Sequence, residues 1–385
     1  MRILILHNKY KNLGGEDIAV NNEYNFLRKF HNVELLYFEN NLKSYIFDIW
    51  GLVSGKNLKS IKFLDKKIKS FQPDIVYVHN TWFKVSTGVF NYLKQNNINT
   101  VLKIHNFRYF CTRSFKSSVH FSMSDMCPAC GLLKKDMGYF NKYFKESLIK
   151  SIYVCIYGKR YLKIIKNFAI KIVVLTDFHK QFLNNLGVDE NKLYVIPNFL
   201  EIKKEEESSN TKQKEIIYAG RISAEKGIKE LIESFKNSGL AEYKLKMIGD
   251  GPLLTEFKEK YENDKIIFTG HLSNQETLKH INNASCIVTA TKLFEGQPNL
   301  LSEASLCKVP SIFPNSGGIK EFFPNDSKLM FEQYNYRDLV LKFQELNKPE
   351  FLDEEGKKNY LYIKNYLDKE KIITQFNKLF DEFEI

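Results

Sequence analysis

The chain has 385 residues, a formal net charge of +12 and hydrophobic residues at 43% of its positions. This length suits two domains of ordinary size, each able to bury its own core. No apolar stretch approaches the roughly 20 residues that span a bilayer, and the apolar start Met1–Leu6 is too short for a signal-peptide core. We therefore expect a cytoplasmic protein whose six cysteines are reduced.

The positive charge is concentrated in the first half of the chain. Residues 1–200 hold 30 lysines and arginines against 14 acidic residues, a balance of +16, whereas residues 201–385 hold 27 against 31, a balance of −4. A basic half indicates an anionic partner such as a membrane surface, a lipid phosphate or a nucleic acid. A lysine-rich genome would produce the same excess without any partner, so both explanations stay open.

Strand and helix patterns alternate along the first half. Short apolar strands separated by longer helices are typical of a parallel sheet covered on both faces. The predicted strands cover 2–7, 33–38, 74–79, 100–105, 171–175 and 193–196, and the clearest helices cover 16–29, 58–70 and 177–186.

A polar segment at 203–210 without periodicity predicts a linker, after which the alternation restarts. Further strands are predicted at 215–219, 243–248, 265–268, 285–290 and 310–313. Two such series predict two Rossmann-like domains with a cleft between them, in which ligands bind at the carboxyl ends of the strands.

Three motifs follow predicted strands of the second series. Gly220 and Arg221 precede a helix start near Lys226, and two cations beside a helix N-terminus suit a pyrophosphate; a solvated basic helix start is the alternative. The turn Gly249–Pro252 follows the next strand, and there we expect Asp250 to cap a helix. Gly270, His271 and Leu272 follow the third strand, where their backbone could border a nucleobase.

The segment 293–319 is the most informative part of the sequence. Glu295 lies in a loop, Pro298 and Asn299 begin a helix, Glu303 lies one turn into that helix, and Gly317-Gly318 follow the next strand. The unpaired N–H groups at a helix start suit a phosphate or a sugar oxygen. Ordinary surface charge is the alternative for both glutamates.

Together these motifs resemble family 4 of the retaining glycosyltransferases, which use nucleotide-sugar donors. The matching residues are Gly220-Arg221, Lys226-Gly227, Gly249–Pro252, Phe268–Gly270, Glu295–Asn299, Glu303-Ala304 and Gly317-Gly318, and the match is closest over 195–325. The resemblance implies an α/β fold of two facing Rossmann-like domains, the GT-B fold, with an interdomain cleft. It implies an acceptor-binding domain at 1–198, a donor-binding domain at 199–368, and a C-terminal helix at 369–385 that returns to the first domain.

The resemblance also implies roles for the matching residues. Arg221 and Lys226 would neutralise the donor diphosphate, Glu303 would accept hydrogen bonds from the ribose, and Glu295 would hold hydroxyls of the transferred sugar. The donor-binding set is completed by Gly15, Gly220, Gly270, His271, Leu272, Gly296, Gln297, Pro298, Asn299 and Leu300. No metal or other cofactor is expected at the phosphate, because the two cations stabilise the leaving group and no Asp-x-Asp motif is present.

Two sites in the first half are candidates for the acceptor side. Gly14-Gly15 follow the first strand, where a turn can approach a ligand closely, although a plain turn explains them equally well. His105 ends a strand and aligns with a family histidine near the reacting sugar, where it would bind a hydroxyl or assist the acceptor. A purely structural histidine is the alternative, and His79 is a weaker candidate.

The cysteines and one helix raise separate questions. Cys127 and Cys130 form a Cys-x-x-Cys pair that could bind a structural zinc ion with Cys111 and Cys155, although free thiols are the stronger expectation.

Residues 140–168 mix aromatic, aliphatic and basic side chains, among them Tyr153, Ile156 and Tyr157. Such a helix could lie in a membrane interface or face the core.

The sequence therefore predicts a retaining, metal-independent hexosyltransferase. It would move a sugar from a nucleotide diphosphate, UDP rather than GDP, to a glycan or lipid-linked acceptor during bacterial surface polysaccharide or lipopolysaccharide assembly, with peripheral contact to the inner face of the plasma membrane. A nucleotide-sugar epimerase or a phosphorylase on the same fold is an alternative. A basic nucleic-acid-binding protein is another, but no nucleic-acid-binding module is evident, so we expect no nucleic-acid partner.

Overall fold

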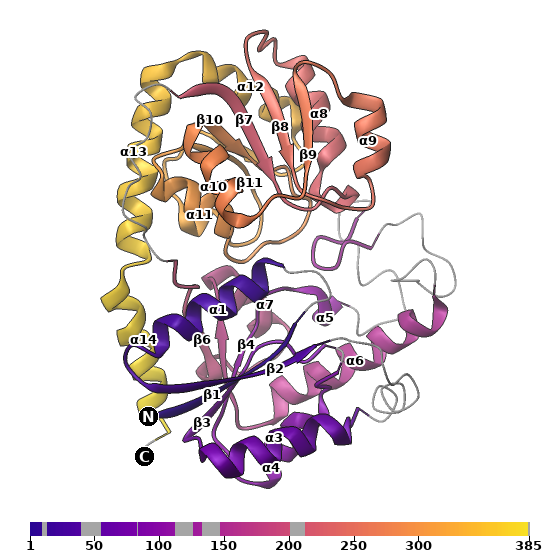
Figure 1. Cartoon of the computed structure of the whole chain (residues 1–385), viewed down its shortest axis with the longest axis vertical. Helices are drawn as coiled ribbons and strands as arrows, with labels where there is room; N and C mark the ends of the chain where they lie inside the picture. Colours follow the sequence, from indigo (N-terminus) through magenta and orange to yellow (C-terminus); the bar gives the residue numbers. More distant parts are fainter. Residues whose placement is uncertain are drawn as a thin grey trace. The chain divides into compact units, whose positions relative to one another are not determined.

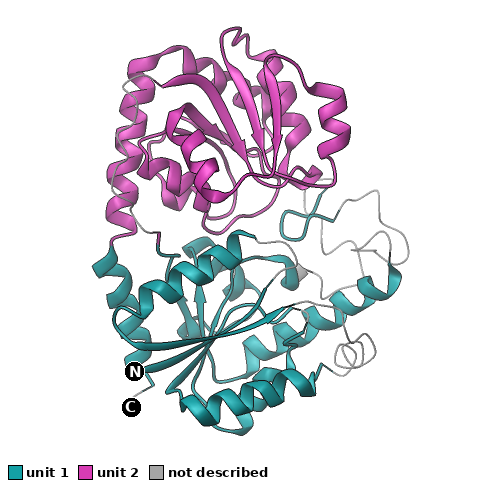
Figure 2. Ribbon diagram, viewed as in Figure 1, with its two compact units in different colours: residues 1–199, 369–385 teal, residues 200–368 magenta. Residues whose placement is uncertain are grey.

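The computed structural model describes residues 1–9, 14–39, 55–82, 84–111, 126–132, 147–200 and 212–383. The predicted linker at 203–210 lies outside these residues. The chain divides into two compact units (Figure 2): unit 1 comprises Met1–Phe199 and Lys369–Ile385, and unit 2 comprises Leu200–Asp368.

Unit 1 is built on a parallel six-stranded sheet in the order β2-β1-β3-β4-β5-β6. Leu4 and Leu6 of β1 pair with Val76 and Val78 of β3, and all four side chains are buried. Burial on both faces explains why these strands are continuous apolar runs. The strands are β1 (Arg2–Lys9), β2 (Asn32–Glu39), β3 (Ile75–Val78), β4 (Thr100–Lys103), β5 (Lys171–Val174) and β6 (Leu193–Val195).

Helices cover both faces of this sheet (Figure 1). Local capping sets where they begin: Asn57 accepts hydrogen bonds from the N–H groups of Lys59 and Ser60, and Thr176 accepts one from His179. The helices are α1 (Gly15–Leu27), α3 (Leu58–Phe71), α4 (Gly88–Gln95), α5 (Arg108–Cys111), α6 (Leu148–Asn167) and α7 (Asp177–Asn185), with a 3₁₀ turn at Glu190–Lys192.

Helix α6 corrects part of the membrane-interface hypothesis for 140–168, whose first residues, 140–146, lie outside the described chain. Tyr153 and Tyr157 are buried, and both pack against Trp82 with ring centroids 5.3 and 5.0 Å away. Its aromatic face therefore belongs to the core, because aromatic burial outweighs an interfacial position. Only the start of α6 exposes apolar side chains, with Ile149 79% exposed.

Unit 2 carries a second parallel six-stranded sheet in the order β12-β11-β10-β7-β8-β9. Five of its strands were predicted and β12 was missed, because three residues are too few for a periodic pattern. The strands are β7 (Gln213–Ala219), β8 (Lys244–Ile248), β9 (Ile266–Gly270), β10 (Ala284–Val288), β11 (Ser311–Asn315) and β12 (Met330–Glu332).

Each helix of unit 2 follows a strand of this sheet, except the last, which follows another helix. They are α8 (Ile228–Asn237), α9 (Leu254–Tyr261), α10 (Asn274–Asn283), α11 (Asn299–Leu306), α12 (Tyr336–Gln344) and α13 (Pro349–Tyr366), with 3₁₀ turns at Ala224–Lys226, Ile319–Phe322 and Glu345–Asn347. The prediction that Asp250 caps a helix was wrong. Its carboxylate accepts a hydrogen bond from the N–H of Gly251, and α9 begins only at Leu254.

The last helix, α14 (Lys369–Asp381), belongs to unit 1. Ile372, Ile373, Phe376, Leu379 and Phe380 are its buried residues. The Phe376 ring lies 6.2 Å from that of Tyr77 in β3, between ring centroids. The chain thus leaves unit 1 at residue 199 and returns to it at residue 369.

Within the described ranges, no helix combines the length and the apolar character needed to cross a membrane.

Candidate functional site

The loops after β7, β8 and β9 are bound to one another through their backbones. The N–H of Gly220 donates to the carbonyl of Ile248 at 2.9 Å, and the N–H of Gly249 donates to the carbonyl of Gly270 at 2.9 Å. A Cβ added to Gly249 would lie 1.9 Å from the carbonyl oxygen of Gly220. Only glycine permits this approach, which explains Gly249 in the second motif.

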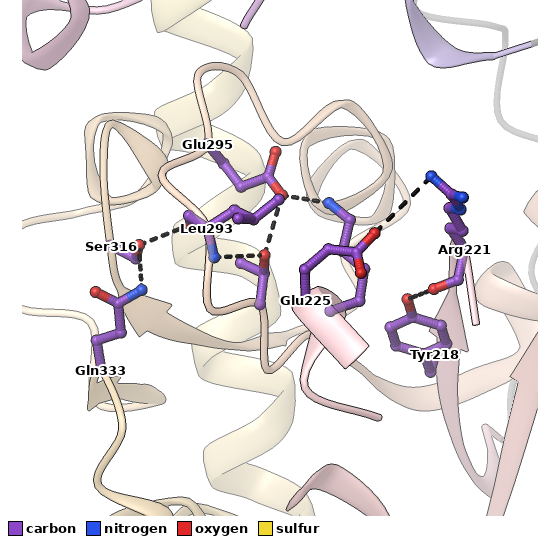
Figure 3. A network of polar contacts seen from close by, with 9 residues as sticks. Tyr218, Arg221, Glu225, Leu293, Glu295, Ser316 and Gln333 are labelled. Atoms are coloured by element: carbon purple, nitrogen blue, oxygen red, sulfur yellow. Dashed lines mark hydrogen bonds and ion pairs between the residues drawn. The ribbon is translucent and has the colours of Figure 1, made fainter. Parts of the chain in front are cut away.

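The centre of the site is an ion pair between the Lys226 ammonium and the Glu295 carboxylate (Figure 3). It joins side chains 69 positions apart in the sequence. The hydroxyl of Thr291 donates to the same carboxylate oxygen at 3.1 Å. Both charged groups are less than a third exposed, so they interact more strongly than a fully solvated pair would.

The Gly317-Gly318 turn holds the Glu295 backbone in place. The N–H of Gly318 donates to the carbonyl of Glu295 at 2.8 Å. Gly317 has φ of +59°, and a Cβ there would lie 2.5 Å from the same oxygen. Ser316 adds a hydrogen bond to the carbonyl of Leu293 and receives one from the amide of Gln333 (Figure 3). The Gly317-Gly318 part of the predicted segment therefore supports the part that carries Glu295.

Arg221 follows β7 by two residues, and its side chain is exposed (Figure 3). Its carbonyl accepts a hydrogen bond from the hydroxyl of Tyr218 at 2.8 Å. Its guanidinium is 58% exposed and lies 3.8 Å from the carboxylate of Glu225, an arrangement worth little by itself. Burial raises the pKa of Tyr218, and the charges of Glu295 and Glu225 raise it further. The buried Tyr218 thus stays a neutral hydrogen-bond donor beneath the site.

Helix α11 begins within four residues of Glu295, and Gln297 just before it is buried. No side chain caps its first turn. The N–H of Asn299 donates to the carbonyl of Gln297 at 3.1 Å, and the N–H groups that follow it at the helix start can meet a ligand. The side-chain oxygen of Asn299 is buried and has no hydrogen-bond partner among the described residues. Glu303 lies in the second turn of the same helix, half-buried.

The loop after β9 supplies the remaining predicted donor contacts. Gly270 has φ of +73° and nothing within 4 Å of an added Cβ. His271 is exposed and Leu272 is half-buried. Because β9 is the edge strand beside β8, these residues border the loops that carry Gly220 and Gly249.

Unit 1 has polar groups at the carboxyl ends of its own central strands. Gly15 begins α1, and Asp17 in its first turn accepts hydrogen bonds from the N–H of Gly14 at 2.9 Å and from His7 at 2.8 Å. A small pocket lies near these strand ends. Its walls include Glu16, His79, Thr81, His105, Asn106 and Tyr157.

His105 lies in this pocket and pairs with His79. His79 Nδ1 and His105 Nε2 are 3.0 Å apart, with the rings stacked at an interplanar angle of 23°. Burial lowers the pKa of both imidazoles well below the usual value, and the neighbouring charges of Lys103 and His7 lower it further. Both rings are therefore neutral at physiological pH.

The cysteines do not form a metal site within the described chain. No group of three His, Cys, Asp or Glu side chains there could hold a metal ion. Cys127 and Cys155 are buried and Cys130 is half-buried, and none of the three forms a disulfide bond. The side chain of Cys111 lies outside the described residues, so the four-thiol zinc site stays a hypothesis.

Sequence reasoning missed one contributor to these sites and gave another a lower rank. Thr291 donates a hydrogen bond to the Glu295 carboxylate, and the polar residues Thr289, Thr291 and Lys292 after β10 were the available signal. His79 was ranked below His105, although it directly follows β3 just as His105 closely follows β4, the neighbouring strand. Neighbouring parallel strands place such residues at one edge.

Comparison with known proteins shows what parts of the chain are similar to. Residues 200–366 match the family model of glycosyl transferases group 1. The amylovoran biosynthesis glycosyltransferase AmsD of Erwinia amylovora is 26% identical over 175 residues, 43% of this chain and 50% of that protein. The capsular polysaccharide biosynthesis glycosyltransferase CapM of Staphylococcus aureus is 26% identical over 228 residues, 53% of this chain and 59% of that protein. The chain thus spans about half the length of these curated relatives.

Solved structures resemble the whole chain. HepE of Anabaena, solved in complex with UDP and glucose, has a TM-score of 0.69 at 13% identity and is matched over 99% of this chain and 100% of its own. Sucrose-phosphate synthase of Thermosynechococcus elongatus has a TM-score of 0.73 at 13% identity, over 99% and 98%. This likeness confirms the predicted α/β fold of two Rossmann-like units, the GT-B fold; the cleft between the units stays a prediction.

Proposed function

We propose that this protein is a retaining glycosyltransferase that moves a sugar from a nucleotide diphosphate to a glycan or lipid-linked acceptor. The observation that carries the proposal is the Lys226–Glu295 ion pair, which brings the two predicted halves of the donor site together in unit 2. The match of residues 200–366 to glycosyl transferases group 1 supports the same conclusion.

The donor would replace the contact that the two charged groups make with each other. Lys226 would turn to the diphosphate together with Arg221, and Glu295 would then accept hydrogen bonds from the sugar hydroxyls. The N–H groups from Gly296 to Leu300 would meet the sugar and phosphate. The side-chain oxygen of Asn299, which has no partner in the described chain, would accept a hydrogen bond from a sugar hydroxyl. Glu303 would bind the ribose, and Gly270, His271 and Leu272 the base.

The chemistry follows from these charges. The bond between the anomeric carbon and the phosphate oxygen breaks, and its electron pair leaves with the diphosphate. The acceptor oxygen bonds to the carbon, and its proton passes to the departing phosphate oxygen. Fixed cations and N–H dipoles aimed at the leaving phosphate lower this barrier. The proposal needs no metal there, because Arg221 and Lys226 supply the positive charge. UDP is favoured because HepE was solved with UDP.

The proposed setting is surface polysaccharide or lipopolysaccharide assembly, as the names of AmsD and CapM suggest.

Peripheral contact with anionic lipid at the inner face of the plasma membrane is part of the proposal. Helix α3 supports it, because Leu58 and Phe63 are 73% and 63% exposed beside the exposed lysines Lys59, Lys62 and Lys66. Exposed apolar groups among lysines are typical of interfacial helices.

Ligand stabilisation and a donor screen test the proposal. UDP or GDP should raise the melting temperature, and a nucleotide sugar should be hydrolysed or transferred. Arg221→Ala and Glu295→Ala should abolish most transfer, whereas Arg337→Ala, an exposed arginine on α12, should keep it. Full activity in both site variants would remove the site model.

The same assays separate the alternatives. Stabilisation by an oligonucleotide alone would indicate a nucleic-acid-binding protein. Conversion of a nucleotide sugar into its isomer without an acceptor would indicate an epimerase.

A further inference from the structure

The pairing of His79 with His105 requires one shared proton. A neutral imidazole has one N–H and one lone pair. His79 Nδ1 and His105 Nε2 are 3.0 Å apart, so one of these two nitrogens carries the hydrogen and the other accepts it. The choice matters, because it decides whether His105 presents an N–H or a lone pair to the pocket that it lines.

The surroundings of His79 distinguish the two arrangements. Its other nitrogen, Nε2, is buried and has no hydrogen-bond partner within the described ranges. Besides His105, two aromatic rings lie next to His79: the centroid of Tyr77 is 4.5 Å and that of His7 6.2 Å from the His79 centroid. If His105 donated, His79 would bury an unpaired N–H at Nε2. If His79 donates, Nε2 is only an unpaired acceptor, which folded proteins tolerate more readily than an orphaned donor.

We propose that His79 is a positioning residue that donates its Nδ1–H to His105 Nε2 and so fixes the proton of His105 on Nδ1. His105 then presents a hydrogen-bond donor to the pocket. It binds an oxygen of the ligand, such as a hydroxyl or phosphate oxygen, and takes no proton from it. Its contribution to sugar transfer rests on the proposed function, whereas the tautomer does not.

The tautomers can be read directly in the full-length protein. The chain has eight histidines, and ¹⁵N-histidine labelling with long-range ¹H–¹⁵N correlation spectra distinguishes Nδ1-protonated from Nε2-protonated rings. Signals are assigned by comparing His79→Asn and His105→Asn with the wild type. We expect both rings to be protonated on Nδ1 at pH 7.5. Protonation of His105 on Nε2 would overturn the proposal.

A pair of substitutions tests the positioning role. The asparagine amide reaches the place of Nδ1, whereas the glutamine amide reaches the place of Nε2. His79→Asn should keep the His105 tautomer and the larger share of kcat, while His79→Gln should lose the fixed tautomer and lower kcat by roughly tenfold. The melting temperatures of both His79 variants are compared with that of His179→Gln, which replaces another buried histidine. This control measures how much stability is lost when an amide replaces a buried imidazole.

Equal kcat values and equal His105 spectra in His79→Asn and His79→Gln would contradict the positioning role. The outcome is separable from the proposed function. Failure of the wild type to use any nucleotide sugar would reject the glycosyltransferase, yet the spectra of the wild type would still decide the tautomer.

Discussion

At the residue scale, the site in unit 2 depends on glycines whose neighbours come too close for a side chain. Gly317 and Gly239 share a left-handed backbone, with φ of +59° and +75°. They differ in their surroundings, because a Cβ on Gly239 meets nothing within 4 Å while one on Gly317 meets the Glu295 backbone at 2.5 Å. Comparing substitutions at Gly239 and Gly317 therefore distinguishes the cost of backbone strain from the cost of crowding at the site.

We expect Gly239→Ala to lower the free energy of unfolding by about 1 kcal/mol, the cost of alanine in this conformation. Gly317→Ala should cost about 2 kcal/mol more, because the Glu295 loop must shift. UDP binding, followed by calorimetry, should weaken by roughly tenfold only in Gly317→Ala. Wild-type affinity in this variant would show that the turn does not position Glu295.

A second residue-scale prediction concerns His179. Burial lowers its pKa to about 3, and its ring packs on Phe107 at 4.2 Å between centroids. The folded ring stays neutral down to that pH, while the unfolded ring gains a proton below about pH 6.5. The unfolded state thus binds more protons, so the stability that His179 contributes is complete above pH 6.5 and decreases as the pH falls.

The pH dependence can be isolated by substitution. Between pH 7 and pH 5, His179→Phe should remove about 2 kcal/mol of the wild-type loss of stability. Urea unfolding followed by tryptophan fluorescence measures it, because both tryptophans, Trp50 and Trp82, lie in the residues of unit 1. An unchanged pH dependence in the variant would show that His179 is protonated in the folded state.

At the element scale, α14 ties the end of the chain to unit 1. Phe376 is 1% exposed in that helix, whereas Phe63 in α3 is 63% exposed, so the same substitution probes a buried and an exposed ring. Phe376→Ala should destabilise unit 1 by about 3–5 kcal/mol, while Phe63→Ala should change it by less than about 0.5 kcal/mol. Tryptophan fluorescence in urea compares them, and a small effect of Phe376→Ala would show that α14 docks only loosely.

The sequence predicted elements better than contacts. Strands such as β1 are continuous apolar runs, and capping residues such as Asn57 mark helix starts, so local physics sets both. Helix α6 was ambiguous, because the same aromatic periodicity suits a core and a membrane. Only the tertiary structure shows that Tyr157 faces Trp82.

The candidate sites show the same limit. The family resemblance implied that Lys226 and Glu295 share a site, but no local rule predicts that they form an ion pair across 69 positions. Likewise, the buried Lys103 ammonium lies 3.0 Å from both carboxylate oxygens of Glu23, 80 positions away. Such pairs depend on which strand ends the fold brings together.

At the scale of the whole molecule, the uneven charge distribution makes a testable distinction between a membrane partner and genome composition. Residues 1–200 have a balance of +16 and residues 201–385 one of −4. If the excess serves membrane contact, it should act where apolar side chains accompany it, as on α3. If it reflects composition alone, lysines of either unit should contribute alike.

We therefore expect the protein to bind vesicles of phosphatidylglycerol and phosphatidylcholine. It should dissociate from them as the salt concentration rises from about 0.05 to about 0.5 M, because salt screens the attraction between lysines and anionic lipid. Each lysine near an anionic surface contributes about 1 kcal/mol, so Lys59→Glu with Lys62→Glu and Lys66→Glu should weaken binding by at least roughly a hundredfold. Lys229→Glu with Lys258→Glu and Lys260→Glu makes the same charge change on exposed residues of unit 2. Co-sedimentation with vesicles compares the two triple variants. The α3 variant should lose more binding, because α3 carries exposed Leu58 and Phe63 beside its lysines. Equal losses of binding in both variants would indicate non-specific attraction by charge instead of a docking face.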